Sequence, residues 1–514
     1  MEIAEKSATL REGHYSLKLP FKKDDVSLPN NFSVVKQRLL GLKKKFLRNE
    51  QFYEEYKTCL NGMISKGYAE QVPVHQLDGG SGKVWYIPHH GVYHPRKRTL
   101  RVVLAACKGT SLNQQLLQGP NLTSTLLGVL VRFRQEPVAV MGDIQAMFHQ
   151  VKVTEEDRDF LRFLWWLEGD LTKELAEFRM TAHLFGAVSS PSCASFALRK
   201  TADDNQSDFP AAVVQTVKEN FYVDDCLKSM GSEEEATFMV KNLTSLCKKG
   251  GFTLTKWVGN NRTMLHTLPE EHRAKDLHEL NLDRDKLPVE RALGLQWCAE
   301  TDAFNFKMDV QQKTCTRRGM LSVSSSVSDP LGFLAPVVLP AKIMLQELCR
   351  RNLGWDDTTP QDILQQWTRW MDLDMLSEFK VERCTKPKGF GHPIHAQLHH
   401  FSDANEAGYG VVTYLRMQNN KNYIHVAFLM GKARVTPIKT VTIPRLELTA
   451  AVLAVRVDLM LKAELKLQLQ ESVFWTDSTS VLKYIMKTSI SIRSWPTGSR
   501  LSEEPLELHN GCEL

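Results

Sequence analysis

Two apolar stretches of the chain each end in aspartate, and this pattern constrains the fold more than any other feature. The segment VAVMGDI reaches Asp143, and the segment FYVDD reaches Asp224 and Asp225. Adjacent carboxylates repel each other and resist burial, so strands that carry them to one end normally meet a cation there. If both strands lie in one sheet, the three aspartates can converge on divalent metal ions. Because Asp-Asp is also a common turn pair, an ordinary exposed turn remains open at this point.

The length and composition indicate several compact units. A chain of 514 residues exceeds one ordinary domain, and its 42% hydrophobic and 24% charged content is typical of globular proteins. The net charge of +6 is compatible with a polyanionic partner. Two basic runs, LKKKFLR at 42–48 and HPRKRTLR at 94–101, suit a surface that follows phosphates, and a solvated charged face explains them equally well.

The cysteines, the N-terminus and the hydropathy indicate an intracellular protein. The 10 cysteines include no C-x-x-C pair and read as reduced thiols. The N-terminus has no apolar signal segment, and no stretch reaches the roughly 18 apolar residues of a membrane span. We therefore expect a soluble, non-secreted protein. His89, His90 and His94 cluster without a second ligand group at metal spacing, which favours a structural role for them.

The pattern along the chain predicts two mixed units with a connecting region between them. Helical periodicity runs through residues 31–70. From 84 to 260, short β-rich runs alternate with helical segments, which is typical of an α+β unit built on an antiparallel sheet. Residues 270–390 read as mostly helical, and a second α/β pattern begins near residue 391. No fixed-period repeat is visible.

Five motifs follow one another in a specific order. They are MGDIQAMFHQ, HLFGAVSSPSCASFAL, FYVDDCL, GGFTLTKW and LGLQW. Together they resemble the palm of a reverse transcriptase, and the residues within the motifs are most similar to those of BEL/Pao-type LTR retrotransposons. The resemblance runs from about residue 14 to about 486. It implies an α+β multidomain chain: a right-hand polymerase fold with fingers, palm and thumb/connection, followed by an incomplete α/β RNase H-like domain.

The resemblance also implies domain boundaries. The N-terminal segment and part of the fingers would span 1–95, and the remaining fingers with the palm 96–262. A largely helical thumb/connection would span 263–390. The RNase H-like domain would span 391–514, truncated at its C-terminus.

The family pattern assigns roles to residues at matching positions. Asp143, Asp224 and Asp225 would be the polymerase carboxylates that hold two Mg²⁺ ions, or Mn²⁺, for phosphoryl transfer, with Asp225 the less certain direct ligand. Lys256 would protonate the departing pyrophosphate. Three further residues would contact the nucleotide: Arg101 along the triphosphate, Phe148 as a steric gate against a 2′-hydroxyl, and Gly186. Three would lie near primer or template: Tyr222, Gly294 and Trp297.

A second set of carboxylates lies near the C-terminus. Asp403, Glu447 and Asp477 occur in FSDANEAGYG, PRLELTA and FWTDSTS, which are similar to the first three acidic motifs of RNase H. Three alanines that share a helical face with Glu447 would let its helix approach the sheet closely: Ala450, Ala451 and Ala454. The resemblance implies that the three acidic residues bind two Mg²⁺ ions and hydrolyse the RNA of an RNA–DNA hybrid.

The chain departs from the family pattern at two places. In the fingers, RVVLAACKGTSLN is shorter than the family's pattern and lacks an aspartate, so we expect weaker nucleotide binding. After about residue 486, the tail does not show the family's pattern of a further helix and a fourth acidic position. We therefore expect an impaired nuclease.

The predicted function is that of a retrotransposon DNA polymerase, directed by RNA and by DNA. Its partners would be an RNA template, a DNA primer, an RNA–DNA hybrid and dNTPs, with no membrane involved. Protease and integrase parts of the Pol polyprotein are expected outside this chain. The expected location is a cytoplasmic virus-like particle or the nucleus. Two alternatives stay open: a decayed or domesticated nucleic-acid-binding protein, and a chain in which nuclease activity alone survives.

Overall fold

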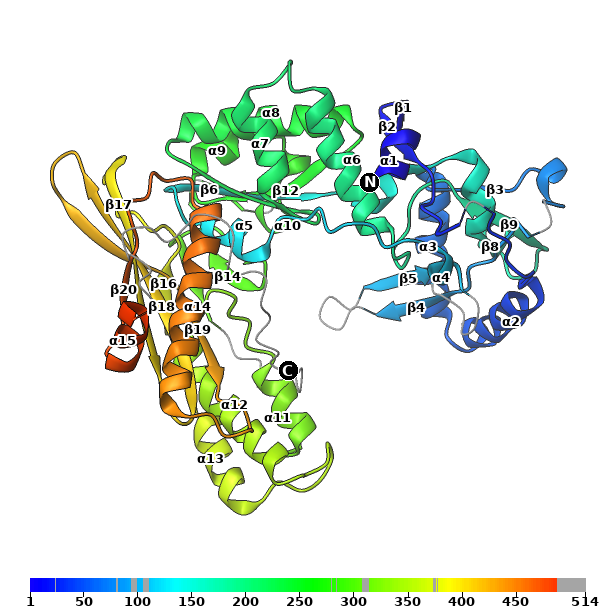
Figure 1. The fold of residues 1–514 in the computed structure, drawn as a ribbon. Coiled ribbons are helices and arrows are strands. Elements are labelled where there is room, and N and C mark those ends of the chain that lie inside the picture. Colours follow the sequence, from blue (N-terminus) through cyan, green and yellow to red (C-terminus); the bar gives the residue numbers. More distant parts are fainter. Residues whose placement is uncertain are drawn as a thin grey trace. The chain divides into compact units, whose positions relative to one another are not determined.

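The computed structural model in Figure 1 describes all residues except 24, 80–81, 94–98, 105–110, 279, 283, 307–313, 373–375, 377 and 488–514. The chain forms two compact units. The first comprises Met1–Asn305 and Lys380–Lys388, and the second comprises Phe306–Phe379 and Gly389–Leu514. Both units mix helices with largely antiparallel sheets, which confirms the predicted α+β class.

A four-stranded antiparallel sheet forms the centre of the first unit. Its order is β10 (Phe221–Tyr222), β11 (Asp225–Met230), β6 (Val138–Ile144) and β12 (Leu254–Gly259). Figure 1 shows α8 (Glu233–Lys249) on one face and α5 (Leu126–Phe133) on the other. Helices α6 (Ser190–Asp204) and α7 (Ala211–Glu219) pack against α8. Because both faces are covered, β6 reads as a continuous apolar run.

Two helices and a second sheet form another part of the first unit. Asn49 separates α2 (Phe32–Arg48) from α3 (Glu50–Ser65), because its side chain caps α3 by accepting from the Phe52 N–H at 2.9 Å. The sheet order is β3 (Ala69–Gln71), β9 (Leu175–Met180) and β8 (Arg162–Trp166). A hairpin of β4 (His89–Tyr93) and β5 (Leu100–Leu104) lies beside α3.

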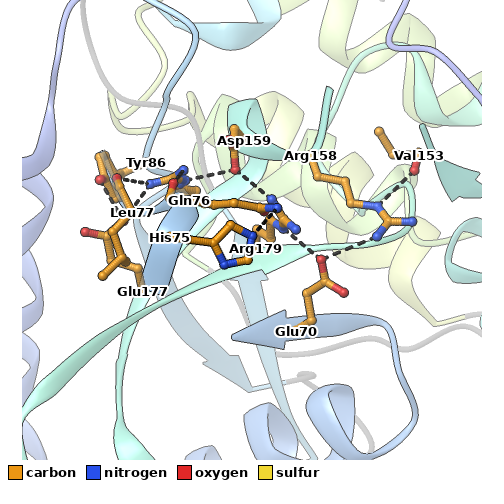
Figure 2. A network of polar contacts seen from close by, with 11 residues as sticks. Glu70, His75, Gln76, Leu77, Tyr86, Val153, Arg158, Asp159, Glu177 and Arg179 are labelled. Carbon is orange, nitrogen blue, oxygen red and sulfur yellow. Dashed lines mark hydrogen bonds and ion pairs between the residues drawn. The ribbon is translucent and has the colours of Figure 1, made fainter. Parts of the chain in front are cut away.

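A buried ionic network ties this sheet to the segments around it (Figure 2). The Arg162 side chain is fully buried and bonds Asp159 at 3.0 Å and Glu177 at 2.9 Å. Arg179 bonds the same Asp159 and also Glu70. Buried guanidinium groups are tolerated when every donor finds an acceptor. The backbone carbonyls of 76 and 77, which accept from Arg162, complete that set.

Smaller elements complete the first unit. A three-stranded sheet has the order β1 (Thr9–Arg11), β2 (His14–Leu17) and β7 (Lys152–Val153). The short helices are α1 (Glu2–Ser7), α4 (Leu112–Gln115), α9 (Arg262–His266) and α10 (Lys275–His278). A further antiparallel sheet has the order β13 (Val289–Ala292), β14 (Leu295–Cys298), β15 (Ala303–Asn305) and β16 (Lys380–Glu382). The segment expected to be largely helical therefore also supplies a sheet.

The second unit combines three helices with an α/β domain. The helices are α11 (Arg317–Ser324), α12 (Ala335–Arg350) and α13 (Gln361–Met371). The sheet order is β19 (Ile424–Val435), β18 (Gly408–Asn419), β17 (Pro393–Ala404) and β20 (Val473–Trp475), with β20 parallel to β17. Helix α14 (Ile443–Glu464) packs on β17 and β18, and α15 (Thr479–Lys487) follows β20. Among the residues described, no helix is long and apolar enough to cross a membrane.

Candidate active sites

The sheet of the first unit brings the three predicted aspartates to one end of two neighbouring strands. Asp225 lies directly opposite Asp143 in the β11–β6 pairing. Asp224 occupies the turn between β10 and β11, and its carbonyl accepts the N–H of Ile144 at 2.9 Å. The turn is thus fixed to β6, and the three aspartates lie at one end of neighbouring strands, although among the described residues they do not form a group with ligand atoms within 4.8 Å of one another.

The turn before the paired aspartates is held in an unfavourable conformation. Val223 has φ +57°, in the left-handed region that β-branched residues rarely adopt. Tyr222 and Asp225 pair across a two-residue hairpin turn, and such turns require a positive φ. This requirement explains the φ of Val223. Strain of this kind persists only where surrounding contacts hold it, and it concentrates at functional sites.

A glycine permits the close packing beneath Asp143. A Cβ built on Gly142 would lie 2.8 Å from Cε3 of Trp257, whose side chain is buried. The indole of β12 therefore lies against the backbone of β6 at the residue that precedes Asp143. Sequence reasoning missed this role, although a glycine that interrupts an apolar strand is the feature that signals close backbone approach.

A bulge in β12 directs Lys256 toward the carboxylates. The pairing with β6 shifts register between Thr255 and Val258, and Lys256 has φ +56°. Bulges next to active sites re-aim side chains. Here the Lys256 ammonium lies 2.9 Å from Oδ2 of Asp143. The lysine selected from the sequence is therefore at the candidate site.

Burial and mutual repulsion perturb the carboxylates. Burial, followed by the charges of Asp224 and Asp143, raises the pKa of Asp225 to about 7. Burial also raises the pKa of Asp224, with a further contribution from Asp143, while Lys256 and Arg101 oppose the shift. Crowded carboxylates that resist ionisation are stabilised by a hard divalent cation. The donor set therefore fits Mg²⁺ or Mn²⁺.

Phe148 lies five positions after Asp143, in a short 3₁₀ helix, and is 7% exposed. Its ring meets Phe185 edge to face with 4.6 Å between centroids, and Phe185 is 64% exposed. A buried aromatic ring thus supports an exposed one. Sequence reasoning selected Phe148 and did not select Phe185.

Gly186 adopts a conformation that other residues would not tolerate. Its φ is +103°, and a Cβ there would lie 2.8 Å from the carbonyl oxygen of Leu104. Asn113 clamps the same loop, because its Nδ2 donates to the Gly186 carbonyl at 2.8 Å and its Oδ1 accepts from the Val188 N–H at 3.0 Å. Asn113 was not selected from the sequence. Arg101 lies on β5 with an exposed side chain.

Gly294 forms the turn of the β13–β14 hairpin, where Leu293 has φ +49° and Gly294 φ +97°. Trp297 is 0% exposed, and its indole N–H donates to Oδ1 of Asp302 at 3.0 Å. Its ring packs edge to face on Phe133. A fully buried side chain cannot touch a primer, so direct contact by Trp297 is excluded and its role is to support the hairpin. Half-buried Tyr222 lies on β10.

The second unit assembles the other predicted carboxylates. Asp403 lies on β17, Glu447 on α14, and Asp477 two residues after β20. One potential ligand atom of each lies within 4.8 Å of those of the others. In the described part of the chain, this is the one group of three or more acidic, His or Cys side chains that meets this distance.

Glu447 shows that this cluster fits a cation. Its Oε2 is buried and has no hydrogen-bond partner among the residues described. Burial, followed by the charges of Asp403 and Asp477, raises the pKa of the Glu447 carboxyl. A buried carboxylate oxygen without a donor is costly. A divalent cation is the partner that the chemistry of these three side chains suits.

Two of the three alanines predicted to face the sheet from α14 are buried, and Ala451 is half-buried. Ala450 and Ala454 are buried at 0% and 1% exposure, and Ala450 packs with Leu446 against Ala404 of β17. The helix therefore approaches the sheet closely enough to bring Glu447 to Asp403.

Three sequence observations lie outside the described residues. They are the core of the basic run at 94–98, the shortened fingers segment at 105–110, and the tail at 488–514. The two expected impairments therefore remain predictions.

Solved structures share this fold. The foamy viral protease-reverse transcriptase dRH in complex with ds DNA matches with a TM-score of 0.52 and 13% identity, over 82% of this chain and 62% of that chain. The foamy viral protease-reverse transcriptase in complex with dsDNA matches with a TM-score of 0.51 and 13% identity, over 84% and 76%. These matches confirm the predicted class, a reverse-transcriptase-type polymerase fold with an RNase H-like domain.

The second unit matches a family model. Residues 316–478 match the family described as Pao retrotransposon-like RNaseH-like domain, and the match begins at α11. This match covers less than half of the chain, and it supports the resemblance to a BEL/Pao-type Pol fragment that the motifs predicted. No curated protein matches the chain.

Proposed function

We propose that the chain is an RNA- and DNA-directed DNA polymerase that adds dNTPs to a primer. The observation that carries this proposal is the convergence of Asp143, Asp224 and Asp225 at one sheet end, with the pKa of Asp225 raised to about 7. Perturbed carboxylates that lie together at one end of a sheet are typical of sites for metal-assisted phosphoryl transfer.

Asp143, Asp224 and Asp225 would hold two Mg²⁺ ions, which supply an activated primer hydroxyl and charge neutralisation on the leaving pyrophosphate. Lys256, whose ammonium lies beside Asp143, would donate a proton from Nζ to the leaving oxygen. Arg101 contributes positive charge near Asp224 and would pair with triphosphate oxygens.

The remaining selected residues would position the substrates. Phe148, which packs edge to face with Phe185, would clash with a 2′-hydroxyl and so favour dNTPs over rNTPs. The Gly186 loop would approach the nucleotide through its backbone. Tyr222 and the Gly294 turn would lie beside the primer, with Trp297 as a positioning residue beneath the turn.

The second unit would hydrolyse the RNA of an RNA–DNA hybrid. Asp403, Glu447 and Asp477 would hold the divalent cations, and the buried, unpartnered Oε2 of Glu447 supports that assignment.

Primer extension on an RNA template with dNTPs and Mg²⁺ tests the polymerase proposal. We expect extension by the native chain and none by the Asp224→Asn/Asp225→Asn variant. Asp403→Asn is the matched control, since it removes a carboxylate from the other unit and should extend normally. If the native chain binds the primer–template but does not extend it, the chain is the nucleic-acid-binding protein of the alternative hypothesis.

The proposed activity also implies a location and neighbours. A retroelement polymerase would work in a cytoplasmic virus-like particle or in the nucleus, together with protease and integrase parts of Pol. Co-sedimentation of the expressed chain with particles that contain RNA tests the first location, and free migration of all the protein at the top of the gradient would argue against it.

A further inference from the structure

One buried histidine in the second unit contacts the elements that position the three carboxylates of the candidate metal centre. His400 lies on β17 and is 0% exposed. Its Nδ1 lies 2.9 Å from the Thr413 hydroxyl on β18, and its Nε2 lies 3.1 Å from Oδ1 of Asp458 on α14. Its ring stacks on Phe474 of β20, with 4.9 Å between centroids. A single imidazole therefore joins three strands and a helix.

Asp458 is the acceptor in the middle of these contacts. Its Oδ1 accepts from His400 and from the Ser472 hydroxyl, and its Oδ2 accepts from Nζ of Lys462 at 2.9 Å. Burial opposes ionisation of this carboxyl, but the hydrogen bonds from His400, Lys462 and Ser472 outweigh burial and hold its pKa below the usual value. Because an ionised carboxylate only accepts, the proton of the neutral His400 ring lies on Nε2, which leaves Nδ1 to accept from Thr413.

The members of this network lie on the same elements as the metal carboxylates. His400 precedes Asp403 by three residues on β17. Asp458 follows Glu447 on α14 by about three helical turns, which returns it to the same side of the helix. Ser472 directly precedes β20, which leads to the third carboxylate. Each contact between elements in the network therefore also constrains the separation between metal carboxylates.

The strand β20 depends on such contacts because it is short and lies at the edge of its sheet. It spans Val473–Trp475, and among the described strands it pairs with β17 alone. Trp475 attaches the strand on its other face, since its ring stacks on Phe401 with 5.7 Å between centroids. Loss of the network should therefore leave β20 paired with β17 and change its spacing from α14.

Stability alone does not account for a buried carboxylate at this place. Transfer of Asp458 out of water is unfavourable, and apolar side chains of similar volume often match or exceed the stability that buried charged groups give. A hydrogen-bonded pair adds direction, since its donor and acceptor meet within a narrow range of distance and angle. Metal sites lose affinity when the groups that orient their ligands are removed.

We propose that His400 and Asp458 are positioning residues for the carboxylate centre of the second unit. They hold β17, α14 and β20 at the separation at which Asp403, Glu447 and Asp477 share divalent cations. Neither touches the cation, because both oxygens of Asp458 are occupied by other donors. This inference rests on the metal centre of the proposed function and adds the residues that hold the centre in shape.

Three variants separate positioning from stability. His400→Leu/Asp458→Leu replaces the buried pair by apolar side chains that fill similar space, so the fold should keep most of its stability while the direction is lost. Lys462→Gln is the matched control: it removes a donor from the same carboxylate, but this donor lies on α14 itself, so no contact between elements is broken. Asp458→Asn is the conservative variant, because its amide oxygen still accepts from His400 and Ser472.

The measurement is Mn²⁺ binding to the full chain without nucleic acid, followed by the electron paramagnetic resonance signal of free Mn²⁺. The parent and all variants carry Asp224→Asn/Asp225→Asn, so that the centre of the first unit does not contribute. We expect His400→Leu/Asp458→Leu to weaken binding by about tenfold or more, while its urea unfolding midpoint stays near that of the parent. Lys462→Gln and Asp458→Asn should bind within about twofold of the parent.

Ser472→Ala tests the same network without a large change in the core. It removes the donor that joins the start of β20 to α14, and it should weaken Mn²⁺ binding by roughly threefold. The proposal is overturned if the double leucine variant binds Mn²⁺ as the parent does, or if Lys462→Gln weakens binding equally. Where the double leucine variant does not fold, parental affinity in Ser472→Ala overturns it.

The positioning role and the proposed nuclease can fail separately. Mn²⁺ binding that His400→Leu/Asp458→Leu weakens, in a native chain that cleaves no RNA–DNA hybrid, would retain the positioning role and remove the nuclease. Cleavage by the native chain, with parental Mn²⁺ affinity in the same variant, would retain the nuclease and remove the positioning role. A parent that binds no Mn²⁺ would overturn both the metal centre and this inference.

Discussion

At the scale of single residues, Asp225 is the carboxyl group at the proposed polymerase site whose ionisation most lowers the stability of the folded chain. Its pKa of about 7 in the fold exceeds the usual value near 3.9 in the unfolded chain. At pH values between these two pKa values, Asp225 is therefore protonated in the folded state and ionised in the unfolded chain. Folding stability falls as pH rises through that window and is level above it.

Asp225→Asn removes this ionisation. In metal-free buffer we expect the variant to exceed the native chain in free energy of unfolding by about 1–2 kcal/mol near pH 8, a value reduced for partial exposure. The difference should vanish near pH 4. Urea denaturation at both pH values measures it, and equal stabilities near pH 8 would contradict the raised pKa.

Phe148→Ala tests whether this side chain is the proposed steric gate against a 2′-hydroxyl. Removing the ring should let rNTPs into the site, so the preference for dNTP over rNTP should fall by about tenfold or more. Incorporation of single dNTPs and rNTPs by the native and variant chains measures this preference. An unchanged preference would mean that Phe148 is only a core residue.

The sequence predicted that Asp143, Asp224 and Asp225 lie together at one sheet end, because each follows an apolar strand. It could not predict that Lys256 pairs with Asp143, since that contact depends on the bulge and register of β12 against β6. The burial of Trp297 was missed for a similar reason. Its partner Asp302 lies on the turn after its own strand, and the motif does not show which face is buried.

At the scale of elements, the packing of β12 on β6 fixes the floor of the polymerase site. The indole of Trp257 fills the space that a side chain at position 142 would need. We expect Gly142→Ala to destabilise the chain by about 1–3 kcal/mol through overpacking, and to weaken extension because Asp143 is next in sequence. Thermal unfolding and primer extension measure the two effects, and native values for both would contradict this packing.

Arg383 joins the strand β16 to the rest of the first unit. Its guanidinium is fully buried, bonds Asp302 at 2.6 and 2.7 Å, and also donates to the backbone carbonyls of 133, 136 and 137. Such a contact between distant segments was not visible in a region read as mostly helical.

Arg383→Met should therefore cost about 3–5 kcal/mol, because it leaves the Asp302 carboxylate and three carbonyls without their donor. Chemical denaturation measures the loss. The Arg383→Met/Asp302→Leu variant should recover part of it, and a loss below about 1 kcal/mol for the single variant would contradict the account.

At the scale of the whole molecule, two units each carry a carboxylate centre. The sequence predicted the mixed class of the chain, because apolar runs and helical periodicity are local properties. It did not show that the chain returns to the first unit at 380–388, since that path depends on long-range pairing of β15 with β16.

If the two carboxylate centres are independent, a substitution in one centre should abolish only the activity of that centre. Asp224→Asn should abolish primer extension and leave any cleavage of an RNA–DNA hybrid, whereas Asp403→Asn should abolish cleavage and leave extension within about twofold. Both assays on both variants measure this, and loss of both activities in either variant would contradict independent centres.

The central claim is that the aspartates at the end of β6 and β11 form a metal centre. The most direct measurement is anomalous scattering from Mn²⁺ in crystals of the chain with primer–template and dNTP. We predict manganese at Asp143, Asp224 and Asp225, separate from manganese at Asp403, Glu447 and Asp477. Manganese absent from the first site, with the Lys256 ammonium still on Asp143, would contradict the account.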